Sequence, residues 1–332
     1  MLLTGNPGGI GHAWARRIFV DRDFKPEENP KDFDFVQAKV WDNKALMDAD
    51  PEYVKRLEDL PEDKRRAYLE GDWDSFSGQV FSEFRREKHT IKPLIPSTKF
   101  THFLWTDWGY AETSAFAAYA SALVEMTSDE GEKINRVITY KEWYGNQKYP
   151  EEWAKIIYED TKEMGIDYRK WIVDPSMLNP KSDGSEPITN MFHRQWKKLN
   201  KGKLWISQTE GGSKQRIQRW ATVHNWLSLA PDGLPYWMIT ENCSNLIRTL
   251  PIMIYDENRP EDLDTSLEDH ASDAVSYGLG FVKFLSAKGS ISRFTIQKRF
   301  KVKPLPLGTP GAPLDLSAFR TNPKKQKDWR AV

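Results

Sequence analysis

Phe103-Leu-Trp-Thr-Asp-Trp-Gly-Tyr110 is the stretch that most strongly indicates the fold of this chain, together with the small and apolar residues at 111–120. An apolar run that ends in a carboxylate, then a Trp-Gly turn and a second apolar run, predicts a β-hairpin. Its first strand carries Asp107 to the edge of a buried sheet. A buried carboxylate is costly unless it is paired or binds a cation. Asp107 is therefore a candidate functional residue, although an Asp before a turn is also a common strand-end residue.

Two later segments repeat this pattern of apolar residues next to acids. Lys170-Trp-Ile-Val-Asp-Pro175 predicts another short strand that ends in a carboxylate, Asp174. Glu268-Asp-His-Ala-Ser-Asp-Ala-Val-Ser-Tyr277 predicts the start of a helix that carries three ionisable side chains. Acids on two strands and one helix can converge at one edge of a sheet. The helix residues concerned are Asp269, His270 and Asp273.

The spacing of the acids in this predicted helix favours a bound cation. Asp269 and Asp273 stand four residues apart on one face, where like charges repel by roughly 0.2 to 0.5 kcal/mol. The helix dipole offers a gain of similar size, so the pair has little to gain without a cation. Carboxylate oxygens from Asp107, Asp174 and Asp273 match the ligands that Mg²⁺ or Mn²⁺ prefers.

The order of the predicted elements indicates an α/β fold with a mixed central sheet flanked by helices. Hydrophobic periodicity predicts strands at about 102–108, 114–124 and 135–144, a helix at about 150–164, and then the strand that ends at Asp174. Three hairpin-linked strands, a helix and a strand that joins beside the first are the order of the ribonuclease H-like fold. Later elements continue the alternation. They are a helix at about 188–199, a strand at 203–207, a helix at 213–227, a strand at 235–240 and a helix at 242–250.

Three regions are expected along the chain. Residues 1–88 contain two predicted helices, at 51–60 and 62–70, and form a small helical module. Residues 89–285 hold the predicted sheet. Residues 286–332 form a basic, Pro-rich tail with 11 Lys or Arg against 2 Asp. This tail suits contact with a polyanion or is a solvated, disordered terminus.

Composition excludes several classes of protein. A single cysteine, Cys243, excludes a disulfide framework and a multi-cysteine zinc site, and is most simply a small buried residue. No run of 18 apolar residues occurs, and the first residues lack the features of a signal peptide. We therefore expect a protein that is neither secreted by this route nor associated with a membrane.

Two further segments have a possible role in binding phosphate. Thr4-Gly-Asn-Pro-Gly-Gly9 precedes a predicted helix, and its backbone N–H groups could bind an anion, although a plain turn is the alternative. It is not a Walker A loop, because Gly-x-x-x-x-Gly-Lys-Ser/Thr occurs nowhere in the sequence. The helix that starts at Ser213 carries basic residues that suit either a phosphate-facing edge or a solvated helix face. They are Lys214, Arg216 and Arg219.

Together these segments resemble the large terminase subunit of tailed bacteriophages, the motor and nuclease of DNA packaging. The resemblance spans about residues 1–285, and its last block is the most distinctive. Its matching pieces are Thr4-Gly-Asn-Pro-Gly-Gly9, Leu69-Glu-Gly-Asp-Trp73, Trp105-Thr-Asp-Trp-Gly-Tyr110, Val173-Asp-Pro-Ser176, Glu261-Asp-Leu-Asp-Thr265 and Glu268-Asp-His-Ala-Ser-Asp-Ala274.

The resemblance implies an ATPase domain followed by a ribonuclease H-like endonuclease that cuts concatemeric double-stranded DNA with two Mg²⁺ or Mn²⁺ ions. It implies a site in the host cytoplasm, at the procapsid, with the portal protein and the small terminase subunit as partners. Asp107, Asp174 and Asp273 would be the catalytic, metal-binding acids. Asp269 and His270 would lie near the second metal. The segment Thr4, Gly5 and Asn6 would couple ATP hydrolysis to movement.

The chain also departs from this family. Walker A and Walker B segments are absent, so residues 1–88 would be the end of an ATPase domain with a lid-like segment, and no ATP hydrolysis is expected from this chain alone. Other interpretations of the sequence remain. A three-acid ribonuclease H-like layout also serves transposases and resolvases. A non-catalytic module that binds DNA or the portal is the alternative from another class.

Overall fold

The computed structural model describes residues 3–7, 12–75, 78–111, 115–128, 130–166, 168, 170–180, 184–200, 204–208, 213–256, 259 and 261–287. Almost the whole expected basic tail, and residues 8–11 of the glycine-rich segment, lie outside these residues. The described chain forms two compact units. The first comprises Met1–Arg86 and Arg248–Leu267, and the second comprises Glu87–Ile247 and the described residues from Glu268 onward.

This division differs at one place from the one expected from the sequence. Arg248–Leu267 belongs to the first unit, although it lies within the range 89–285 assigned to the nuclease domain. The reason is backbone pairing with the segment around Gln79. Val80 N–H donates to the carbonyl of Met253 over 2.9 Å, and Gln79 forms a β-bridge with Ile254. Such pairing between distant segments leaves no periodic signal in the sequence.

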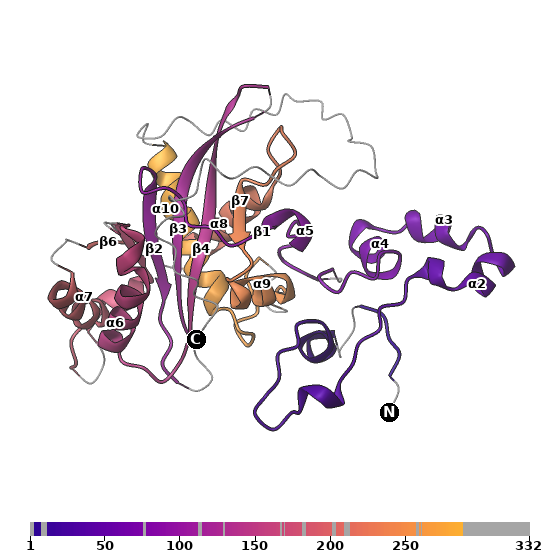
Figure 1. The fold of residues 1–332 in the computed structure, drawn as a ribbon, viewed down its shortest axis with the longest axis horizontal. Coiled ribbons are helices and arrows are strands. Elements are labelled where there is room, and N and C mark those ends of the chain that lie inside the picture. The colour runs from indigo at the N-terminus through magenta and orange to yellow at the C-terminus, as the bar shows by residue number, and fades with distance from the viewer. Residues whose placement is uncertain are drawn as a thin grey trace. The chain divides into compact units, whose positions relative to one another are not determined.

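The second unit is built on one seven-stranded sheet with the order β1-β7-β4-β3-β2-β5-β6. Its central strands form the purple layer in Figure 1. The strands are β1 (Thr90–Ile91), β2 (Thr101–Asp107), β3 (Phe116–Thr127), β4 (Lys133–Gly145), β5 (Lys170–Val173), β6 (Trp205–Gln208) and β7 (Trp237–Thr240).

Strand directions identify the ribonuclease H-like arrangement. β3 is antiparallel to both β2 and β4, whereas β5 joins the other edge of β2 in parallel and β6 follows β5 in parallel. The order β4-β3-β2-β5-β6 is therefore the third, second, first, fourth and fifth strand of that fold. The sequence-based prediction of a mixed ribonuclease H-like sheet flanked by helices is confirmed. β7 and β1 extend the sheet beyond β4, and β1 was not predicted from the sequence.

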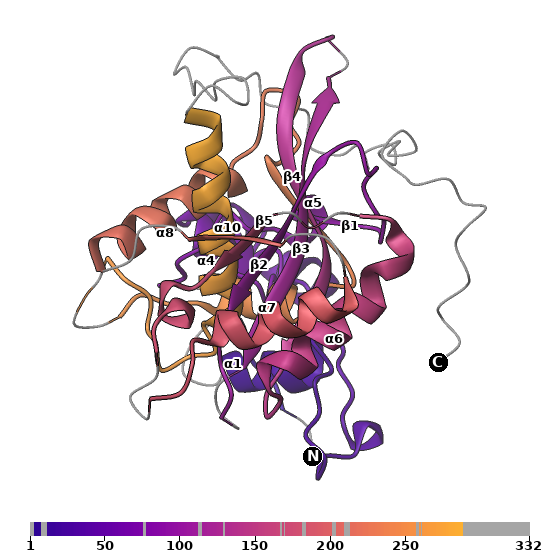
Figure 2. The same cartoon turned by 90° about the vertical axis from the view of Figure 1, so that its left-hand side faces the viewer.

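Helices cover both faces of the sheet, and Figures 1 and 2 show α6 beside α7 and α8 beside α10. On one face, Leu104 of β2 and Trp171 of β5 belong to the core formed with α6 and α7, where Trp171 and Phe192 have ring centroids 4.3 Å apart. Cys243 is fully buried, as expected. Among the described residues no helix has the length and apolar character needed to cross a membrane. The helices of this unit are α6 (Pro150–Thr161), α7 (Ile188–Leu199), α8 (Ser213–Leu227) and α10 (His270–Ala287), while α5 (Arg86–His89) and α9 (Ser244–Thr249) each span a point where the chain passes between the units.

The opposite face of β2 packs against α10. Side chains alternate along a strand, so Phe103, Trp105 and Asp107 share this face. Phe103 contacts Phe281 with ring centroids 6.4 Å apart, and Trp105, which has no exposed surface, lies against Gly278. A Cβ atom on Gly278 would lie 1.9 Å from Cδ2 of Trp105. The glycine therefore permits the close approach of helix and strand.

We expect Gly278→Ala to destabilise the protein by about 1 to 3 kcal/mol, because the buried indole has no room to move. This cost exceeds the helix-propensity gain of about 1 kcal/mol that Ala normally has over Gly. Denaturant unfolding measures the difference. Gly5→Ala is the control, because a Cβ there would meet no atom within 4 Å. An unchanged unfolding midpoint for Gly278→Ala would contradict the packing described.

The first unit contains short helices and much irregular chain. It has buried apolar side chains, among them Phe81, Phe84 and Met253, and ion pairs connect several of its segments. The helical segments are α1 (His12–Ala15), a π-helix (Arg16–Val20), 3-10 turns (Pro30–Asp32, Val40–Asp42 and Leu250–Ile252), α2 (Lys44–Ala49), α3 (Tyr53–Glu58) and α4 (Glu62–Tyr68). The predicted helices at 51–60 and 62–70 correspond to α3 and α4.

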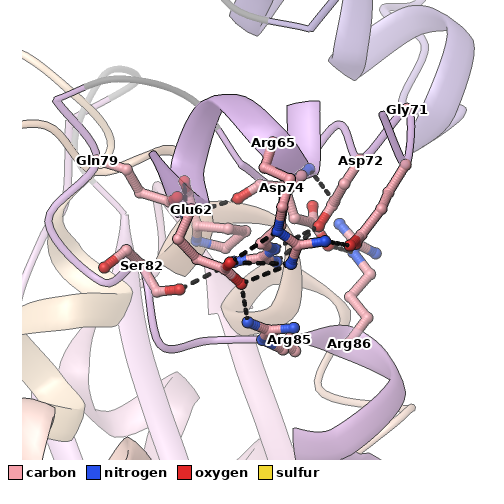
Figure 3. Close-up of polar contacts among 12 residues, drawn as sticks. Glu62, Arg65, Gly71, Asp72, Asp74, Gln79, Ser82, Arg85 and Arg86 are labelled. Carbon is pink, nitrogen blue, oxygen red and sulfur yellow. Dashed lines mark hydrogen bonds and ion pairs between the residues drawn. The ribbon is translucent and has the colours of Figure 1, made fainter. Parts of the chain in front are cut away.

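A network of arginines and carboxylates connects α4 to the chain that follows it (Figure 3). Arg66, only 2% exposed, donates to Oδ2 of Asp72 through Nε and Nη2, and through Nη1 to the carbonyl of Ser82. Arg86 donates to Asp74 over 2.6 Å, and Arg85 donates to Glu62 over 2.6 Å. A buried charge is tolerated only with such partners. The network therefore fixes the path of an irregular segment.

Candidate functional site

Asp107 and Asp174 lie at the carboxyl ends of adjacent parallel strands. Thr106 of β2 is in register with Val173 of β5, so each acid follows the last paired position of its strand. The N–H of Asp174 donates to the carbonyl of Thr106 over 3.1 Å. The two predicted strand-end acids are therefore neighbours in space, although 67 positions separate them in the printed sequence.

The start of α10 brings the third group of predicted residues to the same place. His270 is the first residue of the helix, and its Nδ1 lies 2.6 Å from Oδ2 of Asp107. Asp273 follows one turn later and is 6% exposed, while Asp107 is 7% exposed. The packing of α10 on β2 thus delivers His270 and Asp273 to the end of the strand that carries Asp107.

The acids of this cluster influence one another electrostatically. Burial raises the pKa of Asp107, and the charge of Asp174 raises it further, whereas the hydrogen bond to His270 opposes the rise. Burial also raises the pKa of Asp273 well above its ordinary value, with a second contribution from the charge of Asp107. A cation placed among these oxygens would offset both effects. The arrangement therefore favours binding of a positive charge.

His270 is paired with Asp107. Burial alone would lower the pKa of His270, but the hydrogen bond and the charge of Asp107 outweigh it and raise the pKa. The 2.6 Å contact is a hydrogen bond between Nδ1 of His270 and the Asp107 carboxyl group. His270 therefore orients the Asp107 side chain.

Arg216 of α8 pairs with both acids of α10. Its Nη1 lies 2.9 Å from Oδ2 of Asp273, and its Nη2 lies 3.1 Å from Oδ2 of Asp269. The other carboxylate oxygen of Asp273, Oδ1, is buried and has no hydrogen-bond partner among the described residues. A buried oxygen without a partner is costly, so this atom is suited to a ligand.

Tyr277 and Arg219 support the site from α10 and α8. The hydroxyl of Tyr277 donates to Oδ1 of Asp174 over 3.1 Å, and Ser176 N–H donates to the same oxygen. The guanidinium of Arg219 lies over the Tyr277 ring, 4.3 Å from its centroid, and its Nε donates to Ser276 Oγ. Tyr277 thus fixes the Asp174 carboxylate, and Arg219 fixes Tyr277.

Sequence reasoning missed two groups at this edge of the sheet. Tyr277 stands four residues after Asp273, so helical spacing from that acid could have identified it. Glu268 accepts a hydrogen bond of 2.9 Å from the hydroxyl of Tyr144, which lies at the β4 position in register with Ala117 and hence with Asp107. Only the sheet register brings Tyr144 to the acids, and the sequence alone does not specify that register.

The residues present fit a divalent cation by their chemistry. They supply hard oxygen ligands, and Oδ1 of Asp273 has an unused lone pair in a buried position. As the side chains stand, no three His, Cys, Asp or Glu in the described part of the chain are grouped closely enough to hold an ion. His270 and Arg216 instead contact the carboxylates. The cluster would therefore have to rearrange around a bound cation.

The remaining candidates stay predictions. Lys214 lies in α8, but its side chain is outside the described residues. Arg216 and Arg219 contact residues of the acid cluster in this structure, so any contact with phosphate would require Arg216 to change partner. Thr4, Gly5 and Asn6 lie on the surface of the first unit, and nothing here tests their suggested coupling role.

Comparison with known proteins gives structural neighbours only. No family model matches the sequence, and no curated protein matches it. The nuclease domain of the large terminase of phage P22 is 12% identical, with a TM-score of 0.44, and the alignment covers 63% of this chain and 94% of that domain. The large terminase nuclease of the thermophilic phage G20c, solved with bound cobalt, is 9% identical, with a TM-score of 0.40. This alignment covers 62% of this chain and 98% of that nuclease. Both are terminase nucleases.

Because the pKa of Asp273 is raised, its ionised form destabilises the folded, metal-free protein. We expect Asp273→Asn to raise the unfolding midpoint at pH 7 in EDTA, by roughly 2 to 4 °C for each kcal/mol regained. The gain should shrink as the pH falls towards about 4, the pKa of Asp in an unfolded chain, and vanish below it, because both states are then protonated.

Thermal unfolding at pH 4 and pH 7 measures this difference. Asp160→Asn is the matched control, because Asp160 lies on α6 and contacts Trp143 and Lys141 instead of the cluster. A lower midpoint for Asp273→Asn at pH 7 would contradict the electrostatic account.

Proposed function

We propose that this chain is a metal-dependent endonuclease of the phage large terminase type, which cuts double-stranded DNA. One observation carries the proposal. Carboxylates from the end of β2, the end of β5 and the first turn of α10 meet at one edge of a ribonuclease H-like sheet. These carboxylates are Asp107, Asp174 and Asp273. A site of clustered hard oxygen ligands is suited to phosphodiester hydrolysis with divalent ions.

In the proposed reaction, two Mg²⁺ or Mn²⁺ ions would be held by Asp107, Asp174 and Asp273, with Asp269 as a further candidate ligand. Bound ions of this kind lower the pKa of a water molecule and stabilise the leaving oxygen. The chain's own groups orient the ligands. His270 holds the Asp107 carboxylate, and the Tyr277 hydroxyl holds that of Asp174.

The broader role follows from the sequence resemblance. As part of a terminase, the nuclease would cut concatemeric phage DNA at the procapsid in the host cytoplasm, with the portal protein and the small terminase subunit as partners. ATP hydrolysis is not expected from this chain alone, because Walker A is absent. Transposases and resolvases share the three-acid layout, so the acids alone do not choose the DNA substrate.

Cleavage of supercoiled plasmid DNA tests the proposal. The wild-type chain should nick or linearise the plasmid with Mn²⁺ or Mg²⁺ and leave it intact in EDTA. Asp107→Asn removes one anionic ligand while keeping a similar shape, so its cleavage should fall to the level seen in EDTA. Asp160→Asn, on α6, should cut like the wild type.

Two outcomes would contradict the nuclease assignment. One is equal cleavage by Asp107→Asn and wild type. The other is the absence of metal-dependent cleavage by wild-type protein that binds DNA, which would support the non-catalytic module.

The pKa shifts also predict how metal binding depends on pH. Burial raises the pKa of Asp107 and Asp273, so protons compete with the cation for these oxygens well above pH 4. We expect the Kd for Mn²⁺ to rise as the pH is lowered, by up to about tenfold per pH unit for each proton displaced. Calorimetric titration between pH 5 and 8 measures this. A Kd independent of pH would contradict the assignment of these carboxylates as ligands.

A further inference from the structure

Arg216 occupies an unusual position for a residue of a metal site. Its two terminal nitrogens divide between carboxylates one helical turn apart on α10, at 3.1 Å to Asp269 and 2.9 Å to Asp273. The Arg216 side chain is 20% exposed, so water screens these contacts only in part. Arginine stays protonated at any ordinary pH. A fixed positive charge therefore lies against the acids to which the proposed function assigns a cation.

A guanidinium and a divalent ion cannot share these oxygens without cost. Both are positive, and repulsion between like charges a few ångströms apart is strong in a partly buried site. Arg216 also engages Oδ2 of Asp273, which leaves only Oδ1 available for another ligand. Binding of an ion by Asp273 is thus coupled to the position of Arg216.

We propose that Arg216 is a built-in counter-cation, a positioning residue that closes the metal site in the metal-free protein and releases Asp273 when a divalent cation binds. The inference rests on the proposed function, since it concerns the same acids. It gives Asp273 two states: one in which its Oδ2 is paired with Arg216, and one in which it binds the metal.

The surroundings of Arg216 allow such a release. The guanidinium lies 5.1 Å from the ring centroid of Trp220, one turn further along α8. An arginine over an aromatic face is stabilised without any carboxylate. Arg216 can therefore give up Asp273 and keep its contacts with Trp220 and Asp269. Arg219 is less suited to this role, because it is 7% exposed and its guanidinium lies over Tyr277.

Calorimetric titration of the full chain with Mn²⁺ tests the inference without measuring activity. Arg216→Gln removes the competing charge and should bind Mn²⁺ more tightly than wild type, by about tenfold or more, because like charges a few ångströms apart repel strongly in a partly buried site. Arg216→Lys keeps the charge but cannot span two carboxylates, so its Kd should fall between those of wild type and Arg216→Gln.

Arg194 provides a matched control. It also bridges two carboxylates, Glu151 and Glu186, but it belongs to α7, which packs beside α6. Arg194→Gln should bind Mn²⁺ with the wild-type Kd. If Arg194→Gln instead lowered the Kd for Mn²⁺ as much as Arg216→Gln, the loss of any positive charge would explain the tighter binding. That result would overturn the proposal.

Thermal unfolding gives a second readout. In EDTA, Arg216→Gln should unfold at a lower temperature than wild type, because Asp269 and Asp273 lose their counter-charge. Saturating Mn²⁺ should raise its midpoint by more than it raises that of wild type.

The outcomes separate the two proposals. Unchanged or weaker Mn²⁺ binding by folded Arg216→Gln and Arg216→Lys, with wild type binding normally, would overturn the role of Arg216 alone. No Mn²⁺ binding by wild type or either variant would overturn the metal-dependent function, and the role of Arg216 with it.

Discussion

The close packing of α10 on β2 is the constraint on which the site depends. Gly278 lets the helix lie directly against the buried Trp105 ring, and the contact between Phe281 and Phe103 extends this seam along the strand. Because the helix is held this close, its first turn ends at the carboxyl end of β2. His270 and Asp273 are therefore placed beside Asp107 by packing, and not by any attraction among the acids. Such packing can hold like charges close together, because the stability of the rest of the fold offsets the free energy of their repulsion.

The charge balance of the cluster explains its second property. Burial and mutual repulsion raise the pKa of both Asp107 and Asp273, so the acids are poised to accept positive charge. In this structure Arg216 contacts Asp269 and Asp273, and His270 contacts Asp107. Under the proposed function, a divalent ion would have to displace Arg216 from Asp273. Metal affinity would then be a difference between two paired states, sensitive to pH and to Arg216.

The sequence could predict that these acids lie near one another because each stands at the end of a strongly patterned element, and their role as metal ligands stays a prediction. Asp107 and Asp174 close apolar strands, and Asp273 opens a helix, so order of elements was enough to bring them together. The sequence did not predict which residues pair with these acids. Arg216 was expected at a phosphate-facing edge or on a solvated helix face, yet it pairs with acids 53 and 57 positions away, a contact that only the packing of α8 on α10 creates. The Tyr144–Glu268 contact depends in the same way on sheet register.

Anomalous diffraction from crystals of the wild-type chain soaked in Mn²⁺ tests the central claim most directly, because it locates the ions themselves. The account predicts manganese peaks bonded to Asp107, Asp174 and Asp273, with the Arg216 guanidinium moved away from Asp273 towards Trp220. Manganese bound elsewhere, or an Asp273 that stays paired with Arg216 at saturating Mn²⁺, would contradict it.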